Sequence, residues 1–125
     1  MADLVSLQGR WLDEKRFDDT RSIFTEDATG EFPSGPVRGA DALADQALRN
    51  HRDYERTQHV TTNVLIEVDG DNATVGANLV ATLVPRADVP DSRLTIGERY
   101  RFEAVRTAAG WRFSRVEVRP VWRSR

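Results

Sequence analysis

Apolar residues recur at helical spacing in three segments of the first half of the chain. The spacing predicts helices over residues 3–15, 18–25 and 40–51. The last of these has the clearest pattern, because its apolar positions follow one another at i, i+3, i+4, i+7 and i+8: Ala40, Leu43, Ala44, Ala47 and Leu48. In the first segment the apolar stripe is formed by Leu4, Leu7, Trp11 and Leu12. Each helix is therefore expected to bury one face.

The second half of the chain has the pattern of long strands. Residues 58–68 and 72–84 flank the turn Asp69-Gly70-Asp71, and residues 94–107 and 111–122 flank a second turn that ends at Gly110. A short extended piece, residues 28–32, leads into a loop at residues 33–36, and residues 86–93 join the two hairpins. Helices followed by hairpins predict an α+β fold with helices on one side of an antiparallel sheet. Strands this long need strong curvature to cover a small core, which favours a cone.

The composition excludes several classes of protein. A chain of 125 residues has room for a single domain, residues 1–125. The net charge is −2 and the arginines are spread along the chain, so no nucleic-acid partner is expected. The longest apolar runs are too short to span a membrane, and Met1-Ala2-Asp3 does not open a secretory signal, which predicts a cytoplasmic protein without a membrane partner. Without cysteine there is no disulfide, thiolate nucleophile or cysteine metal site.

Several short strings, in their order along the chain, resemble the NTF2-like superfamily. They are Trp11-Leu12-Asp13, Ile23-Phe24-Thr25-Glu26-Asp27-Ala28, Arg38-Gly39-Ala40-Asp41-Ala42-Leu43, Thr57-Gln58-His59-Val60, Asp69-Gly70-Asp71-Asn72-Ala73, and Tyr100 to Arg106 followed by Gly110-Trp111-Arg112-Phe113. Within the superfamily they are most similar to the SnoaL-like polyketide cyclase and scytalone-dehydratase-like branches. The resemblance implies about three N-terminal helices packed on a curved sheet that encloses a pocket. The superfamily contains isomerases, dehydratases, cyclases, a dehydrochlorinase type and proteins of no known activity, so function stays open.

The resemblance also implies a catalytic pair. In the catalytic branches an aspartate late in the first helix pairs with a histidine on the first long strand, and these positions match Asp13 and His59. A neutral histidine, with an ordinary pKa of about 6.5, can accept a proton near neutral pH. A carboxylate behind it fixes the tautomer and stabilises the imidazolium.

Purely structural interpretations compete with this one. On an ideal helix Asp13 falls away from the apolar stripe, as a solvated residue would. His59 shares its strand face with Thr61, Asn63, Leu65 and Glu67, a polar face that solvent usually covers. His51 ends the third helix, where a histidine commonly meets the last carbonyls and the helix dipole. Two histidines without cysteine do not indicate a metal site.

Further residues are candidates for binding the substrate. They are Phe24, Phe32, Tyr54, Asn63, Tyr100, Trp111, Arg115 and Trp122. The aromatic members could line an apolar cavity or simply fill the core, and Asn63 or Arg115 could polarise a carbonyl. Two positions depart from the family: Gln8 stands where many relatives carry a tyrosine, and Phe102 where an acidic residue is frequent. No motif for a cofactor or a phosphate is present.

These observations favour an acid–base enzyme without metal or cofactor, an isomerase, dehydratase or cyclase that acts on a small, largely apolar carbonyl or polyketide-like compound. A ligand-binding or accessory protein without chemistry is the alternative from another class, and a stand-alone dimerisation module is a third. A homodimer is expected, because Val60, Val64 and Ile66 share the other face of their strand with Val68 and would expose a large apolar patch on a monomer.

Overall fold

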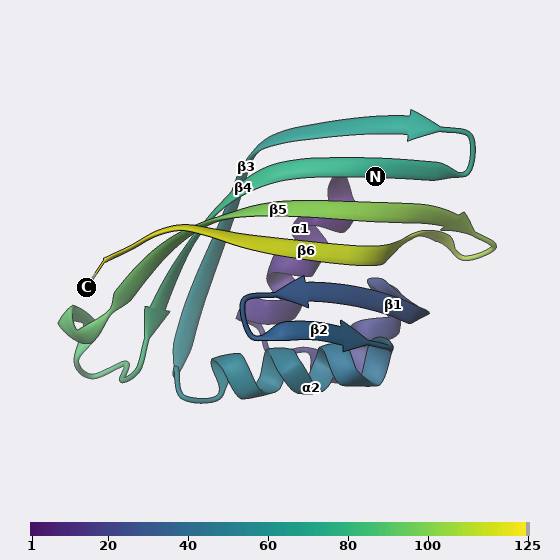
Figure 1. Ribbon diagram of the computed structural model, residues 1–125. Coiled ribbons are helices and arrows are strands. Elements are labelled where there is room, and N and C mark those ends of the chain that lie inside the picture. The colour runs from purple at the N-terminus through teal and green to yellow at the C-terminus, as the bar shows by residue number, and fades with distance from the viewer. Residues whose placement is uncertain (125) are drawn as a thin grey trace.

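The structure, a computed structural model, describes residues 1–124. Its helices are α1 (Ala2–Asp13), the 3-10 turn η1 (Phe17–Ser22), α2 (Ala40–His51) and a second 3-10 turn, η2 (Pro90–Ser92). Its strands are β1 (Phe24–Phe32), β2 (Gly35–Arg38), β3 (Arg56–Asp69), β4 (Asn72–Val84), β5 (Leu94–Thr107) and β6 (Gly110–Ser124) (Figure 1). Within these residues no helix is long and apolar enough to cross a membrane.

The strands form one curved, mixed sheet in the order β2-β1-β6-β5-β4-β3. All neighbours are antiparallel except β1 and β6, which run parallel with Thr29 opposite Arg115. The expectation of a purely antiparallel sheet is corrected at this one junction. After β1 and β2 the chain crosses through α2 to the far edge and returns by two long hairpins, and β6 then reaches β1 in the same direction. The sheet does not close, since β2 and β3 are its edges.

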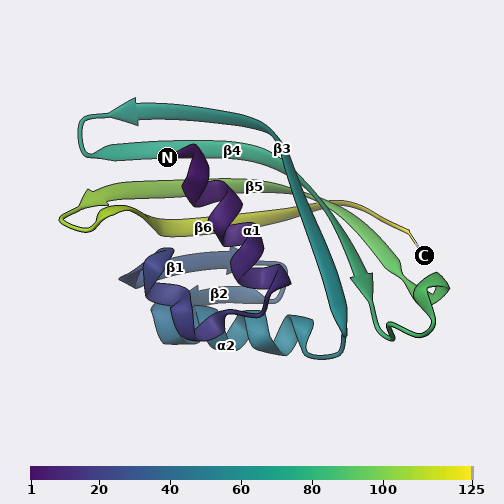
Figure 2. The same ribbon diagram turned by 180° about the vertical axis from the view of Figure 1, so that it is seen from behind.

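The helices cover the concave side of this sheet and close the core. Figure 2 shows α1 crossing the sheet diagonally while α2 lies along β1 and β2. Between them three buried phenylalanines meet: the Phe102 and Phe113 rings stack with centroids 4.1 Å apart, and Phe24 lies beside Phe113. Trp11 on α1 meets the edge of Phe24 at 5.3 Å. The wide buried band on α1 includes Gln8 and leaves Leu7 exposed, contrary to the predicted stripe.

The segment before α2 differs from the prediction. The helix expected over residues 18–25 is a 3-10 turn that ends at Ser22, and β1 begins at Phe24. Phe24 is an aromatic residue that pairs with Phe113 of β6 in the core, which favours the strand over the helix. The loop expected at residues 33–36 is a tight turn, because Gly35 adopts φ +120° and starts β2.

A bulge in β3 reverses which side chains face the core. Asn63 adopts a φ of +55°, and the register with β4 shifts between Thr62 and Leu65. Before the bulge His59 lies opposite the buried Ala81, and after it Ile66 lies opposite the buried Val75. The prediction assumed strict alternation along the whole strand and placed Ile66 on the outer face. Beyond the bulge this prediction was wrong, because Ile66 faces the core.

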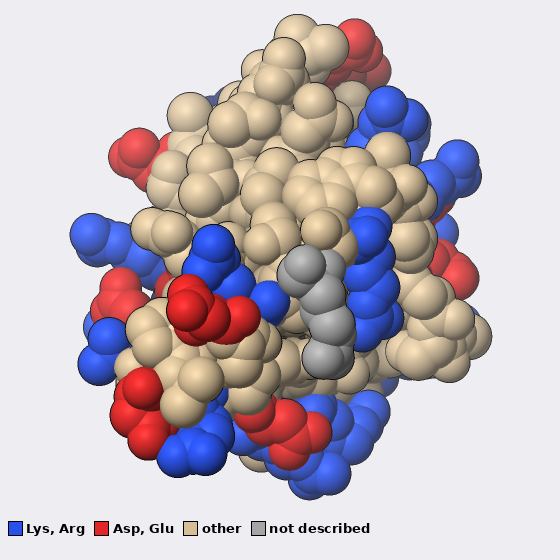
Figure 3. Space-filling view, turned by 90° about the vertical axis from the view of Figure 1, so that its left-hand side faces the viewer, with Lys and Arg blue, Asp and Glu red and all other residues tan. Residues whose placement is uncertain are grey.

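The outer side of the sheet carries exposed apolar residues. Val60 of β3 lies opposite Val80 of β4, and Trp122 of β6 lies over Gly97, which is the β5 partner of Val80. Exposed fractions are 47%, 38% and 45% for Val60, Val80 and Trp122. Figure 3 shows a broad uncharged area on this side, with most charged side chains at its margins.

We propose that this outer face forms a homodimer interface. Val80 and Trp122 contribute to it, whereas Ile66, which was expected to contribute, faces the core instead. Val80→Arg should then halve the mass measured by sedimentation, because a charge at the centre of an apolar contact cannot be desolvated cheaply. Val89→Arg, at an exposed loop residue, is the matched control and should stay dimeric. A wild-type protein that sediments as a monomer at every concentration would refute the interface.

Candidate active site

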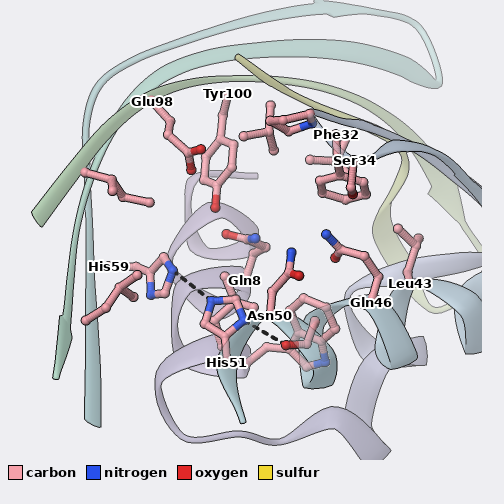
Figure 4. Close-up of a pocket in the computed structure, with 18 of the residues that line it drawn as sticks. Gln8, Phe32, Ser34, Leu43, Gln46, Asn50, His51, His59, Glu98 and Tyr100 are labelled. Atoms are coloured by element: carbon pink, nitrogen blue, oxygen red, sulfur yellow. Dashed lines mark hydrogen bonds between the residues drawn. The ribbon is translucent and has the colours of Figure 1, made fainter. Parts of the chain in front are cut away.

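A cavity of about 260 Å³ lies between α1, α2 and the concave face of the sheet. Its wall is largely apolar, with polar groups at a few positions, as in many small-molecule sites. The lining residues are Gln8, Trp11, Leu12, Phe24, Phe32, Pro33, Ser34, Leu43, Gln46, Ala47, Asn50, His51, His59, Leu83, Ile96, Glu98, Tyr100, Val116 and Val118. Figure 4 shows the polar side chains of α1, α2, β3 and β5 converging on it.

Asp13 and His59 meet at the edge of this cavity. Asp13 is the last residue of α1, and His59 lies on the inward face of β3 before the bulge. The distance between His59 Nδ1 and Asp13 Oδ1 is 2.5 Å. The His59 side chain is 5% exposed and that of Asp13 25%. The two residues that the family resemblance singles out are therefore in contact, and His59 lines the cavity.

The Asp13 carboxylate accepts further hydrogen bonds. The Thr57 hydroxyl donates to Oδ1 at 2.9 Å, and the backbone N–H of His59 donates to Oδ2 at 2.9 Å. Burial by itself raises the pKa of Asp13, but the hydrogen bonds from His59 and Thr57 outweigh it and the pKa is lowered. An ionised Asp13 only accepts hydrogen bonds, so the proton in the contact with His59 is on Nδ1. The Nε2 atom of neutral His59 is then a free base.

His51 is a third member of this group. Its Nδ1 donates to the backbone oxygen of Ala47 at 2.7 Å, the helix-end contact that the sequence suggested. Its Nε2 lies 3.4 Å from Nε2 of His59, and its ring also lines the cavity. Burial lowers the pKa of His51. In the part of the chain that the structure describes, no set of three or more His, Cys, Asp or Glu side chains could hold a metal ion.

Two polar residues of β5 face the histidines across the cavity. Glu98 and Tyr100 point inward in Figure 4, above Gln8 and His59. Burial raises the pKa of the Glu98 carboxyl, opposed by the charge of His59, and burial also raises the pKa of the Tyr100 hydroxyl. Sequence reasoning missed Glu98. The available signal was its place between Ile96 and Tyr100 on an otherwise apolar strand face.

Three carboxamides were also missed as lining residues. Gln46 and Asn50 share the inner face of α2, one helical turn apart, and Gln8 projects from α1. Gln8 is only 4% exposed, and within residues 1–124 its Oε1 is the buried side-chain oxygen without a hydrogen-bond partner. An orphaned buried carbonyl normally has a water or ligand donor. Gln8 therefore marks a point of the wall where a water or a bound molecule would donate a hydrogen bond.

The residues expected to bind substrate divide into two groups. Phe24, Phe32 and Tyr100 line the cavity. Tyr54 lies in the turn between α2 and β3 and packs against the core outside the cavity, and Asn63 occupies the exposed bulge of β3. Neither of these two side chains lines this cavity: Tyr54 packs against the core, and Asn63 supplies the left-handed conformation that the bulge requires.

Three more candidates on β6 also lie outside the cavity. Trp111 packs at the far end of the sheet, where the Arg106 guanidinium lies 4.8 Å from its ring centroid. Arg115 forms ion pairs with neighbouring glutamates near a shallow outer groove. Trp122 covers Gly97 on the outer face. Because β6 is paired along nearly its whole length, only its inward residues Val116 and Val118 reach the cavity.

The lowered pKa of Asp13 predicts a pH-dependent stability. A carboxyl with a lower pKa in the folded than in the unfolded state stabilises the fold above its unfolded value, about 3.9, and loses that contribution as the pH falls through the folded value. Asp13→Asn should therefore cost stability at pH 7 and progressively less toward pH 3. Urea unfolding at both values measures this, with the exposed Asp53→Asn as control. An equal cost at both pH values would contradict the assignment.

Solved structures share this architecture over nearly the whole chain. The Kfla4162 protein from Kribbella flavida is 26% identical with a TM-score of 0.89, covering 98% of this chain and 89% of that one. A putative scytalone dehydratase from Novosphingobium aromaticivorans is 20% identical, with a TM-score of 0.86 and coverage of 98% and 83%. A type 2 hexachlorocyclohexane dehydrochlorinase, LinA, is 23% identical, with a TM-score of 0.83 and coverage of 98% and 84%. At these identities the last two establish the fold alone.

One of the similar solved structures is named as a member of the NTF2-like superfamily. An NTF2-like superfamily protein from Salmonella enterica aligns with a TM-score of 0.85 at 16% identity, over 96% of this chain and 87% of that one. No curated protein sequence matches the chain. The sequence model of the SnoaL-like domain matches residues 1–117, which include the helices, the cavity wall and the contact between Asp13 and His59. The chain therefore belongs to the SnoaL-like domain family, within the NTF2-like fold.

Proposed function

We propose that this protein is an acid–base enzyme that needs no metal or organic cofactor and that isomerises, dehydrates or cyclises a small, largely apolar carbonyl or polyketide-like compound. The observation that carries the proposal is the 2.5 Å contact of His59 Nδ1 with Asp13, because it leaves Nε2 of a cavity-lining imidazole as the base. The names of two similar structures, a putative dehydratase and a dehydrochlorinase, denote eliminations and are compatible with it.

The proposed step is a proton transfer from substrate to His59. Nε2 takes a proton from the carbon next to the carbonyl, the C–H electron pair forms a C=C bond, and the carbonyl π electrons move to oxygen. Asp13 stabilises the imidazolium that results. Burial raises the pKa of Glu98, and wherever the pH lies below that raised pKa its neutral carboxyl can donate a hydrogen bond to the developing oxyanion. The later fate of the enol differs between the three reaction types and follows from substrate structure.

The unpartnered carbonyl of Gln8 predicts that the ligand carries a hydrogen-bond donor. A hydroxyl or amide N–H on the ligand would donate a hydrogen bond to Oε1 in the place of a water. Gln8→Met, similar in size, should therefore weaken binding of a hydroxylated carbonyl ligand by roughly tenfold, and should leave its analogue without the hydroxyl unaffected. Calorimetric titration of both ligands against both proteins measures the difference. Equal weakening of the two ligands would show that Gln8 only shapes the wall.

A thermal-shift screen tests the proposal before the substrate is known. Cyclic, aromatic and steroid-like carbonyl compounds that enter the cavity should raise the unfolding temperature, because binding stabilises the folded state by mass action. Ala47→Leu fills part of the cavity from α2 and should abolish these shifts. A compound that binds tightly but never turns over would support the alternative, a non-catalytic binding protein. A screen without any cavity-dependent hit would remove the support for both.

A further inference from the structure

The two histidines of the chain face one another through the same ring atom. His51 Nε2 and His59 Nε2 lie 3.4 Å apart, with ring centroids 5.3 Å apart and planes tilted by 47°. Both rings are largely buried at the cavity wall. One comes from the last turn of α2 and the other from β3, so the contact depends on the fold and not on local sequence.

The outer partners fix the tautomer of each ring. A backbone carbonyl only accepts, so His51 Nδ1 must carry the proton that it shares with Ala47. Asp13 is ionised, so His59 Nδ1 must carry the proton in that contact. With both Nδ1 atoms protonated, two neutral rings would present two Nε2 lone pairs to each other. A single added proton turns this repulsion into one N–H···N hydrogen bond.

We propose that His51 and His59 bind one proton jointly between their Nε2 atoms, and that His51 is a positioning residue which stabilises the protonated form of the base. A second proton would bring two imidazolium rings face to face and is disfavoured. The joint proton is a property of the pair and does not depend on any reaction. Its effect on turnover rests on the function proposed above.

The surrounding charges place the joint proton on the His59 side. Asp13 and Lys15 face the pair from the end of α1 and the segment after it, and Glu98 faces it from β5. Asp13 touches His59, whereas burial and the charge of His59 lower the pKa of His51. The charge therefore sits on His59, beside the carboxylate, while His51 accepts the hydrogen bond. In the reaction, a proton taken from substrate by His59 would be held in the same way.

Nuclear magnetic resonance tests the joint proton without any ligand. The chain has only two histidines, so ¹⁵N-histidine labelling gives one spectrum with four ring nitrogens. We expect two protonation steps separated by more than about one pH unit, with the Nε2 signals of both rings moving together in the first. Two rings that titrate independently, each unchanged when the other is replaced, would overturn the proposal.

Two variants separate the hydrogen bond from packing. His51→Phe keeps an aromatic ring but removes the acceptor, and should move the first protonation step to lower pH by about one unit or more. His51→Gln keeps an acceptor that cannot take a proton, and should give a smaller shift in the same direction. If the phenylalanine variant unfolds, the glutamine variant still decides, since a His59 midpoint in His51→Gln equal to that of the wild-type first step would contradict the pair.

The effect of the histidine pair on catalysis is measured separately, from the pH dependence of kcat/KM. With a substrate in hand, the acid limb of the kcat/KM profile should move to lower pH in His51→Phe by the amount seen in the titration, while a residue that only packs would change the rate without moving the limb. Absence of turnover with any substrate would refute the proposed function and leave the titration result standing.

Discussion

Replacing His59 by glutamine is expected to lower kcat/KM by about 10²-fold or more, the usual contribution of a general base. His59 is the imidazole that both contacts the Asp13 carboxylate and lines the cavity. Glutamine can still donate an amide N–H to Asp13, so the architecture is retained while the base is lost. The loss should appear mainly in kcat, because binding depends on the apolar wall.

The control for this variant is its stability. An unfolding temperature close to that of the wild type would assign the loss to chemistry. Turnover at the wild-type rate in His59→Gln would contradict the mechanism and transfer the chemistry to another cavity group, with Glu98 and Tyr100 as the first candidates.

Asp13→Asn is expected to cost a comparable or smaller factor in kcat/KM, of the order of 10²-fold. The carboxylate accepts from the Thr57 hydroxyl and from the backbone and ring of His59, and only an anion accepts from all of them through two oxygens. Asparagine has one oxygen, so its NH₂ must face a donor, and the imidazolium loses its counter-charge. Steady-state rates at a saturating substrate concentration give kcat, and rates at a low concentration give kcat/KM.

Asp53→Asn is the matched control, because Asp53 is exposed and lies in the turn after α2. It should leave kcat/KM unchanged. An Asp13→Asn enzyme with full activity would show that Asp13 only anchors β3 to α1.

Much of the fold was predictable because its signals are local. The α2 spacing, the turn at Gly70 and the long alternating strands each specify an element by themselves, and the structure has all of them. The parallel pairing of β1 with β6 was not predictable in this way, because it joins residues about ninety positions apart. The bulge at Asn63 was missed for a similar reason: one residue with positive φ reverses a face without changing the composition of the strand.

The site was only partly predictable from sequence. The resemblance pointed to Asp13 and His59, which helix periodicity and strand alternation, respectively, would have placed in solvent. His51 was recognised as a helix-end residue, but its second nitrogen meets a strand eight positions later in the chain, which no spacing rule reveals. Aromatic character alone does not place a residue in the cavity, because a small domain also uses residues such as Trp111 and Trp122 at the end and on the outside of its sheet.

Hydrogen–deuterium exchange of a bound carbonyl compound tests the central claim most directly. The best ligand of the thermal-shift screen is incubated in D₂O with wild-type protein and with His59→Gln, and loss of the proton signal next to the carbonyl is followed by nuclear magnetic resonance. Removal of this proton by His59 predicts rapid exchange with the wild type, slower by about 10²-fold or more in the variant. Exchange at the same rate in both proteins, with the ligand bound equally well, would contradict it.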